Sequence, residues 1–390
     1  MAGRVAPYID NTGLVFAYDQ ANIVRSYLGE PTVNLLYSAG ATNLLNGAGD
    51  IYGRCTKTDL GNGKYRFVNN GTGVSTVRVY TNQGDLINGA TYACSVYYEN
   101  LIGGVGIDWC DTGITGLNYS TNVSGRLGGY GTRGTYDGPY YFLDINFDSG
   151  GAVTLFNPQV EYKSHVTPFV AGTRSVTQGL KDLTSRSTID LSNVSFDSSA
   201  QMTFDGTDDK IHGITAVHSH LSSSAIEFVV TPESTGKKMT VGGYRHNEGY
   251  SSPTIGMVYI DSNNKFYASV ITAAEVYRFV ESVTTIQANR TYHVVFNKDT
   301  SAGVMQLYVN GVAEGAQTFN AATYAQWSSA GSYIGSDTID LGKSFNTNSG
   351  QGWSGDFLDG KIHTFKMFSK TLTASEIQQN FNAVRGRYGI

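Results

Sequence analysis

The chain has 390 residues, which is more than one domain of roughly 150 residues requires. Its 27 basic and 32 acidic residues nearly balance, so we expect no nucleic-acid binding. No apolar run approaches the about 18 residues that a membrane-spanning helix needs, so we expect no membrane insertion.

Cysteine usage and the first residues bear on where the chain is made. Cys55, Cys94 and Cys110 form neither a closed disulfide set nor a C-x-x-C metal pattern. The first residues contain no apolar segment of the kind that signal peptides carry. We therefore expect synthesis in a reducing cytosol, without disulfide bonds.

Short alternating runs bounded by Gly, Asn, Asp or Ser fill the first half of the chain, which is typical of a β-sandwich or barrel. Residues 31–174 are the part richest in Gly and Tyr, and their regular strand spacing predicts a jelly-roll-like sandwich. The strands that we expect there include Lys64–Val68, Ser75–Tyr80, Thr91–Tyr98 and Tyr140–Ile145.

The second half carries the clearest strand signals. Ala225–Val230 is a strand candidate that we expect to end before Pro232, and 257–260 with 265–270 read as a hairpin. Tyr292–Phe296 is a further strand. The run Met305–Val309 alternates and stops at Asn-Gly, which favours a type I′ turn and a return strand from residue 312.

A helix is predicted at the C-terminal end of the sequence. Thr373 and Glu376 have the spacing of a capping box, and Leu372 and Ile377 that of a hydrophobic staple. We expect the helix to run from residue 374 to 384, to stop near Gly386 and to brace a sandwich.

Four segments of the second half resemble the laminin-G-like, concanavalin-A-like lectin/glucanase superfamily. His363 stands where the family often has Asp, and Tyr292 where Trp is usual. The segments are 202–211 (MTFDGTDDKI), 291–296 (TYHVVF), 307–311 (LYVNG) and 357–377 (FLDGKIHTFKMFSKTLTASEI). The resemblance implies a concanavalin-A-like sandwich.

Gly13–Asp19 resembles the opening strand of such a domain. In the family a short segment containing Asp-Leu normally follows directly, whereas here such segments come only at 182–184 and 190–192. The intervening chain ends in Phe156–Glu161 and Thr167–Val170, which resemble the tail of carbohydrate-binding-module-like jelly rolls. The resemblance therefore implies an all-β protein with two β-sandwich domains, one inserted into a loop of the other, and a short C-terminal helix. Its parts would be residues 1–30 (arm and opening strand), 31–174 (insert) and 175–390 (remainder with the helix).

This arrangement also resembles virion proteins of tailed phages, especially cyanophages. The resemblance implies a non-enzymatic capsid decoration, neck or tail-fibre protein, made in the host cytoplasm and exposed on the particle. Other virion proteins, further copies of the chain and host-surface polysaccharide would be its partners. Alternatives are a cellular carbohydrate-binding or adhesion protein and a glycan-degrading enzyme. Glucanases of the superfamily carry E-x-D-x-(x)-E, and no Glu in this chain is followed two residues later by Asp.

Aromatic side chains among Gly and polar residues are the candidates for glycan or interface contact. Flat amphipathic rings suit both sugar faces and protein interfaces. Ordinary core or loop positions are the alternative for each. The candidates are Tyr119, Tyr130, Tyr136, Tyr140, Tyr141, Trp327 and Trp353.

Two clusters are candidates for metal binding. Asp205, Asp208 and Asp209 surround a Gly turn and suit Ca²⁺, which binds six to eight oxygens. Asp19 is expected in the same region if it heads the opening strand. The alternative is that Asp205 caps the turn and the other two are solvated. His218 and His220 form an H-x-H pair that would share one strand face and suit a transition metal, or else lie in a polar loop. Calcium is the cofactor that the sequence suggests.

Overall fold

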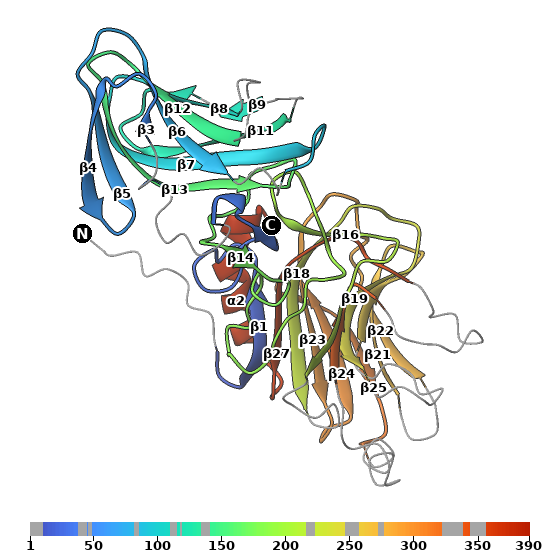
Figure 1. Cartoon of the computed structure of the whole chain (residues 1–390). Coiled ribbons are helices and arrows are strands. Elements are labelled where there is room, and N and C mark those ends of the chain that lie inside the picture. The colour runs from blue at the N-terminus through green and yellow to red at the C-terminus, as the bar shows by residue number, and fades with distance from the viewer. Residues whose placement is uncertain are drawn as a thin grey trace, which may run out of the picture. The chain divides into compact units, whose positions relative to one another are not determined.

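The computed structural model describes residues 11–37, 45, 49–81, 86–109, 115–117, 119–133, 141–215, 223–245, 257–271, 277–321, 338–343 and 356–390. Strands are the main secondary structure of these residues, with an α-helix at the C-terminal end, so the all-β prediction is confirmed (Figure 1). The chain divides into two compact units. The split unit comprises Met1–Leu28, Val176–Asp197 and Gln201–Ile390, and the inserted unit Gly29–Ser175 with Ser198–Ala200.

The split unit is built from two sheets. Its strands are β1 (Leu14–Asp19), β15 (Ser195–Phe196), β16 (Met202–Asp205), β17 (Ile211–Thr215), β18 (Ser224–Pro232), β19 (Met239–Arg245), β20 (Met257–Ile260), β21 (Phe266–Ile271), β22 (Tyr277–Glu281), β23 (Tyr292–Asp299), β24 (Val304–Val309), β25 (Val312–Thr318), β26 (Thr338–Leu341) and β27 (Asp359–Phe368). The eight-stranded sheet has the order β15-β16-β27-β18-β23-β24-β25, with β1 also paired to β27. The six-stranded sheet has the order β17-β26-β19-β20-β21-β22.

Alternation along the strands creates the core between these two sheets. In β24 the buried residues are Met305, Leu307 and Val309, every second position, and they join side chains of both sheets in one cluster. The predicted type I′ turn is confirmed, since Asn310 and Gly311 both have positive φ, 49° and 80°, and β25 starts directly after them.

The inserted unit is a second two-sheet sandwich with its own core. Its elements are β2 (Thr32–Val33), the 3-10 helix η1 (Leu35–Tyr37), β3 (Gly49–Asp50), β4 (Cys55–Gly61), β5 (Lys64–Asn69), β6 (Ser75–Thr81), β7 (Thr91–Ile102), β8 (Val105–Trp109), β9 (Thr115–Leu117), β10 (Tyr119–Ser120), β11 (Gly125–Thr132), β12 (Tyr141–Phe147), β13 (Ala152–Glu161) and β14 (Thr173–Arg174). A five-stranded sheet, β10-β8-β12-β6-β3, packs on a six-stranded one, β4-β5-β13-β7-β11-β9.

Hydrogen bonds close each unit where the chain passes from one to the other. In the inserted unit β2 and β14 pair antiparallel, so its two ends lie side by side, which is the geometry that a loop insertion requires. In the split unit the buried carboxylate of Asp182 accepts from the N–H of Ala17 in β1 at 3.0 Å. It also accepts from the N–H groups of Thr184, Arg186 and Ser187. Residues 15–19 are thus held to the chain that follows the insert.

The C-terminal helix α2 (Ala374–Tyr388) packs against the eight-stranded sheet (Figure 1). Its capping box is confirmed: Thr373 accepts from the N–H of Glu376, whose carboxylate accepts from the N–H of Thr373. The predicted stop at Gly386 is wrong. The helix continues to Gly389, which has a φ of 68°.

Two predicted boundaries thus differ from the structure for reasons of tertiary contact. Arg387 and Tyr388 donate to the carboxylate of Asp19, at 2.6 and 3.4 Å, and so hold the last helical turn in place. Strand β18 runs on through Pro232, which pairs with Gly360 as the last residue of the strand, a place that proline tolerates.

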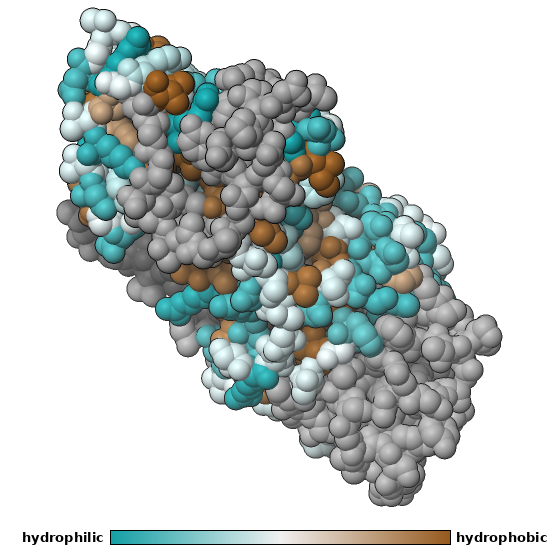
Figure 2. All heavy atoms as spheres, in the orientation of Figure 1, coloured by the Kyte–Doolittle hydropathy of each residue, from teal (hydrophilic) through white to brown (hydrophobic). Residues whose placement is uncertain are grey.

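Two further observations concern membrane-spanning helices and the hydropathy of the surface. Among the described residues, no helix combines the length and the apolar character that a membrane crossing requires. On the face drawn in Figure 2, the described residues are mostly hydrophilic or neutral, with hydrophobic ones in small separate groups.

Candidate functional site

The outer face of the five-stranded sheet of the inserted unit carries a hollow that is lined by both polar and apolar residues, Val74 and Ile107 among the apolar ones. In β12 Leu143 and Ile145 lie in the core, so the alternating Asp144 and Asn146 point to the opposite face. A hollow of about 250 Å³ lies on this face. The residues that line it include Gly106, Asp108, Tyr119, Asn146, Phe147 and Asp148.

Tyr119 forms the aromatic wall of this hollow. It pairs with Gly106 across β10 and β8, and 54% of its surface is exposed. A Cβ atom on Gly104 would lie 2.0 Å from Tyr119 Oη and 3.0 Å from Asp148 Oδ2. The glycine at 104 therefore gives the phenol ring the room to lie across the strand, beside an acceptor group.

Internal hydrogen bonds orient the polar groups of the hollow. The Thr76 hydroxyl donates to Asn146 Oδ1 at 2.5 Å, and Asn146 Nδ2 donates to Asp108 Oδ2 at 3.2 Å. Asp148 Oδ2 accepts from the N–H of Gly104 at 2.6 Å. An aromatic ring, an amide and two carboxylates thus converge in fixed positions, a combination suited to a ligand rich in hydroxyl groups.

An ion pair lies next to the hollow on the same sheet face. Arg78 Nε and Nη2 donate to the two carboxylate oxygens of Asp144, both at 2.7 Å. Such a bidentate pair neutralises both charges locally.

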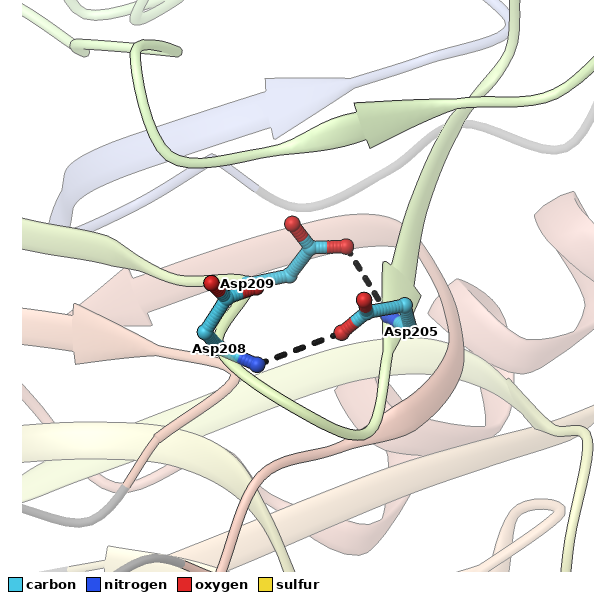
Figure 3. A group of neighbouring side chains, drawn as sticks. All are labelled: Asp205, Asp208 and Asp209. Atoms are coloured by element: carbon cyan, nitrogen blue, oxygen red, sulfur yellow. Dashed lines mark hydrogen bonds between the residues drawn. The ribbon is translucent and has the colours of Figure 1, made fainter.

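The three predicted calcium ligands meet in one turn of the split unit, after β16 (Figure 3). Asp205 Oδ1 accepts from the N–H groups of Thr207 and Asp208, at 2.8 and 3.2 Å. Asp209 Oδ2 accepts from the N–H of Asp205 at 2.9 Å. One carboxylate oxygen from each aspartate lies within 4.8 Å of the others. The structure therefore brings the three residues together.

The electrostatics of this turn differ from one aspartate to the next. The N–H of Thr207 lowers the pKa of Asp205, whereas burial raises the pKa of Asp209, whose Oδ1 accepts from the Ser195 hydroxyl at 3.1 Å. Three carboxylates supply about half of the oxygens that Ca²⁺ binds, so these residues fit only part of a calcium site. Calcium binding stays a prediction.

The remaining predicted residues are spread over the chain. Asp19 pairs with Arg387 and is not part of the acidic turn. Tyr130 is 40% exposed in β11, on the other sheet from Tyr119, and Tyr141 begins β12. Outside the described residues lie Tyr136, Tyr140, Trp327, Trp353, His218 and His220.

Most residues of the hollow are not among the candidates that the sequence pattern indicates. Asp108, Asn146, Asp148 and the glycine at 106 were not candidates. Polar residues at 144, 146 and 148 alternate with apolar ones, and this pattern was the signal that could have shown one polar face. The expected strand stopped at Ile145, whereas β12 continues to Phe147.

The second half of the chain matches a known family. Residues 205–378 match the family described as the Concanavalin A-like lectin/glucanases superfamily, which confirms the resemblance for that part of the split unit. No curated protein matches the chain.

Several solved structures match part of the chain. The Ruminococcus gnavus IT-sialidase CBM40 is 16% identical with a TM-score of 0.33, over 40% of this chain and 82% of that one. A heptameric SAP-like pentraxin from Limulus polyphemus is 14% identical with a TM-score of 0.33, over 45% and 78%. Trypanosoma rangeli sialidase is 12% identical with a TM-score of 0.39, over 52% and 30%.

Proposed function

We propose that the protein binds carbohydrate and does not cleave it. The observation that carries this proposal is the match of residues 205–378 to the lectin/glucanase superfamily, in a unit built as a two-sheet sandwich. Within such a superfamily, fold alone does not separate a lectin from a hydrolase, so the distinction rests on the carboxylates.

The carboxylates favour binding over hydrolysis. Retaining and inverting glycosidases use two carboxylates that flank the scissile bond, and the E-x-D pattern of the glucanases is absent from this sequence. Glu227 in β18 is fully buried, and its Oε1 lies 2.5 Å from Lys366 Nζ. This glutamate is committed to an internal ion pair and is closed to substrate.

We further propose that the chain is a structural protein of a phage particle. The support is its resemblance to tailed-phage proteins and its low content of charged residues, 15%, which limits the unpaired charge that an assembly would have to desolvate. Other virion proteins and further copies of the chain would be its partners, and host-surface polysaccharide its ligand. A cellular adhesion protein with the same sugar-binding role is the second candidate.

A glycan array probed with the full chain tests the first proposal. We expect saturable binding to a restricted group of glycans, with intact reducing ends after prolonged incubation. Release of shortened glycans would contradict the non-enzymatic part, and failure to bind any glycan would contradict the proposal as a whole.

Mass spectrometry of purified phage particles tests the structural role. We expect the chain at a fixed copy number per particle. Its recovery only from cell envelopes would favour the adhesion protein instead.

A further inference from the structure

We infer that Lys366 and Asn380 are a site at which the chain forms an intramolecular isopeptide bond, with Glu227 as the group that transfers the protons. The site lies in the split unit, under the helix α2, which packs on the eight-stranded sheet (Figure 1). The bond joins strand β27 covalently to this helix. It is independent of sugar binding, so the inference goes beyond the proposed function.

Strand register brings the lysine and the glutamate together. Glu227 in β18 pairs directly with Lys366 in β27. The residues on either side of Glu227 belong to the core between the two sheets, so its carboxylate points to the opposite face, on which α2 packs. Asn380 reaches the same point from the buried side of the helix.

One carboxylate binds both reacting groups. Lys366 Nζ lies 2.5 Å from Glu227 Oε1, and Asn380 Nδ2 donates to Glu227 Oε2 at 2.7 Å. The amine and the amide are therefore neighbours across a single carboxylate group. Because lysine has a flexible four-carbon stem, a change of its rotamer is enough to turn Nζ from Oε1 towards the carbonyl carbon Cγ of Asn380.

Burial favours the reaction between these groups. The side chains of Glu227 and Asn380 are fully buried, and Lys366 is 7% exposed. Apolar residues such as Leu372 and Ile377 surround the contact between helix and sheet. Groups that are held together in a site without water react as if they were highly concentrated. Apolar side chains would attach the helix without the cost of burying an amine, an amide and a carboxylate, so a chemical role accounts for these residues.

The reaction needs no further reagent. Glu227 Oε1 takes a proton from the ammonium group of Lys366, and the lone pair of the neutral amine forms a bond to Asn380 Cγ. The Cγ–Nδ2 bond then breaks, and its electron pair leaves with Nδ2. The two protons that Nζ loses pass through the carboxylate to this nitrogen, which departs as an ammonium ion. One ammonium group and one amide thus become a substituted amide and a free ammonium ion, and Glu227 is a carboxylate again.

The charged pair is the state before the bond forms. The basic groups in contact with Glu227 are Lys366 and His293 of β23, whose Nε2 lies 3.4 Å from Oε1. An ammonium group has no lone pair, so the ion pair persists in freshly made protein at neutral pH. The bond forms slowly there and faster at alkaline pH, where more of the amine is neutral.

Intact-mass measurement and peptide mapping of the folded full chain test the inference, on fresh protein and after incubation at neutral and at alkaline pH. Lys366→Arg keeps the positive charge but has no attacking amine, and Asn380→Ala removes the amide. Glu227→Gln keeps both reacting groups and removes the proton carrier. Asn382→Ala is the matched control, because this asparagine of the same helix bonds to Gln378 and not to the glutamate.

We expect fresh protein to have its full mass, and the incubated protein to lose one ammonia. The peptide map should then contain a branched peptide in which residues 366 and 380 are joined. This map is decisive, because an Asn-Gly pair such as Asn62-Gly63 also releases ammonia when it closes to a succinimide. Lys366→Arg and Asn380→Ala should give no branched peptide, and the control should match the wild type. Glu227→Gln should form the bond at least about a hundredfold more slowly.

Two results would overturn the inference. Absence of the branched peptide from folded wild-type protein after alkaline incubation would remove the bond, and this measurement needs no variant. An equal rate in Glu227→Gln, with circular dichroism showing a folded chain, would remove the role of the carboxylate. Neither result bears on sugar binding, which the glycan array tests separately.

Discussion

Both units bury a glutamate, and the two carboxylates are stabilised in different ways. In the split unit, Glu227 faces the ammonium group of Lys366 at 2.5 Å and accepts from the amide of Asn380 at 2.7 Å. In the inserted unit, Glu161 accepts from the hydroxyls of Thr32 and Thr167, at 2.7 and 2.5 Å, and from the N–H of Thr167 at 2.9 Å. The carboxylate of Glu227 thus contacts an opposite charge, whereas the groups that donate to Glu161 in these hydrogen bonds are all neutral.

The two glutamates nevertheless have the same structural role. Glu227 connects β18 to the helix α2, 153 positions further along the chain. Glu161, at the end of β13, connects to β2, 129 positions earlier, and so holds the two ends of the inserted unit together. Each one fixes a contact of very long sequence separation at a buried point. The comparison teaches that burial of a carboxylate can be offset by one opposite charge or by several aligned donors.

Removal of the positive charge of Lys366, which lies beside Glu227, should have the largest effect on stability. Lys366→Met removes the ammonium group beside the buried Glu227 and leaves His293, 3.4 Å from its Oε1, as the remaining basic neighbour. We expect a loss of about 3–5 kcal/mol in the free energy of unfolding of the split unit. Urea denaturation measures it. The double variant Glu227→Gln with Lys366→Met should recover part of the loss, because no charge then remains buried. A loss below about 1 kcal/mol would show that the pair is hydrated in solution.

Acid should lower the stability of the split unit through protonation of Glu227. Burial alone would raise its pKa, but the positive charge of Lys366 and the contact with His293 together outweigh burial and lower the pKa from 4.5 to about 2. Since the folded-state pKa is the lower one, this stability is present above pH 4.5 and is lost as the pH falls towards 2. A shift of this size corresponds to about 3 kcal/mol. Denaturation curves of the wild type and Glu227→Gln across this window should converge at the acid end, and parallel curves would contradict the assignment.

Loss of the negative charge of Glu161 should lower the free energy of unfolding of the inserted unit by a smaller amount. Glu161→Gln removes one acceptor from a site whose donors are all directed at oxygen, and it removes a negative charge that interacts with Arg126. We expect a loss of about 1–3 kcal/mol in the free energy of unfolding. Glu99→Gln is the matched control. Glu99 pairs with Lys64 at 2.8 Å at the surface of the same unit, and its loss should cost about 0–1 kcal/mol. Equal costs for the two variants would contradict the role of Glu161.

A substitution in the acidic turn of Asp205, Asp208 and Asp209 should have the smallest effect on stability. Asp205→Ala removes the acceptor of two backbone N–H groups, and we expect a loss of about 1 kcal/mol whether or not calcium is added. Differential scanning calorimetry with Ca²⁺ and with a chelator measures both parts. A calcium-dependent rise in melting temperature that disappears in Asp208→Asn would establish a calcium site, since among the described residues the carboxylate of Asp208 has no hydrogen-bond partner to lose.

Local signals in the sequence predicted the elements of both units. The alternation of β24, its Asn-Gly turn and the capping box of α2 each depend on residues a few positions apart, and all three are confirmed. The acidic turn was found for the same reason, because its three aspartates lie within five consecutive residues. Elements of this kind follow from backbone preferences and periodicity.

The candidate hollow and the buried charges depend instead on strand order. Tyr119 was a candidate, but its partners Asn146 and Asp148 come from a strand and a turn further along the chain, which β8 and β12 bring beside it. The helix passes its expected end because Asp19, from the other end of the unit, holds its last turn. The sequence by itself determined the strands, the turns and the helix start. Tertiary structure decided which side chains meet, because hydrogen-bonded pairing of distant strands sets those neighbours and no local periodicity encodes it.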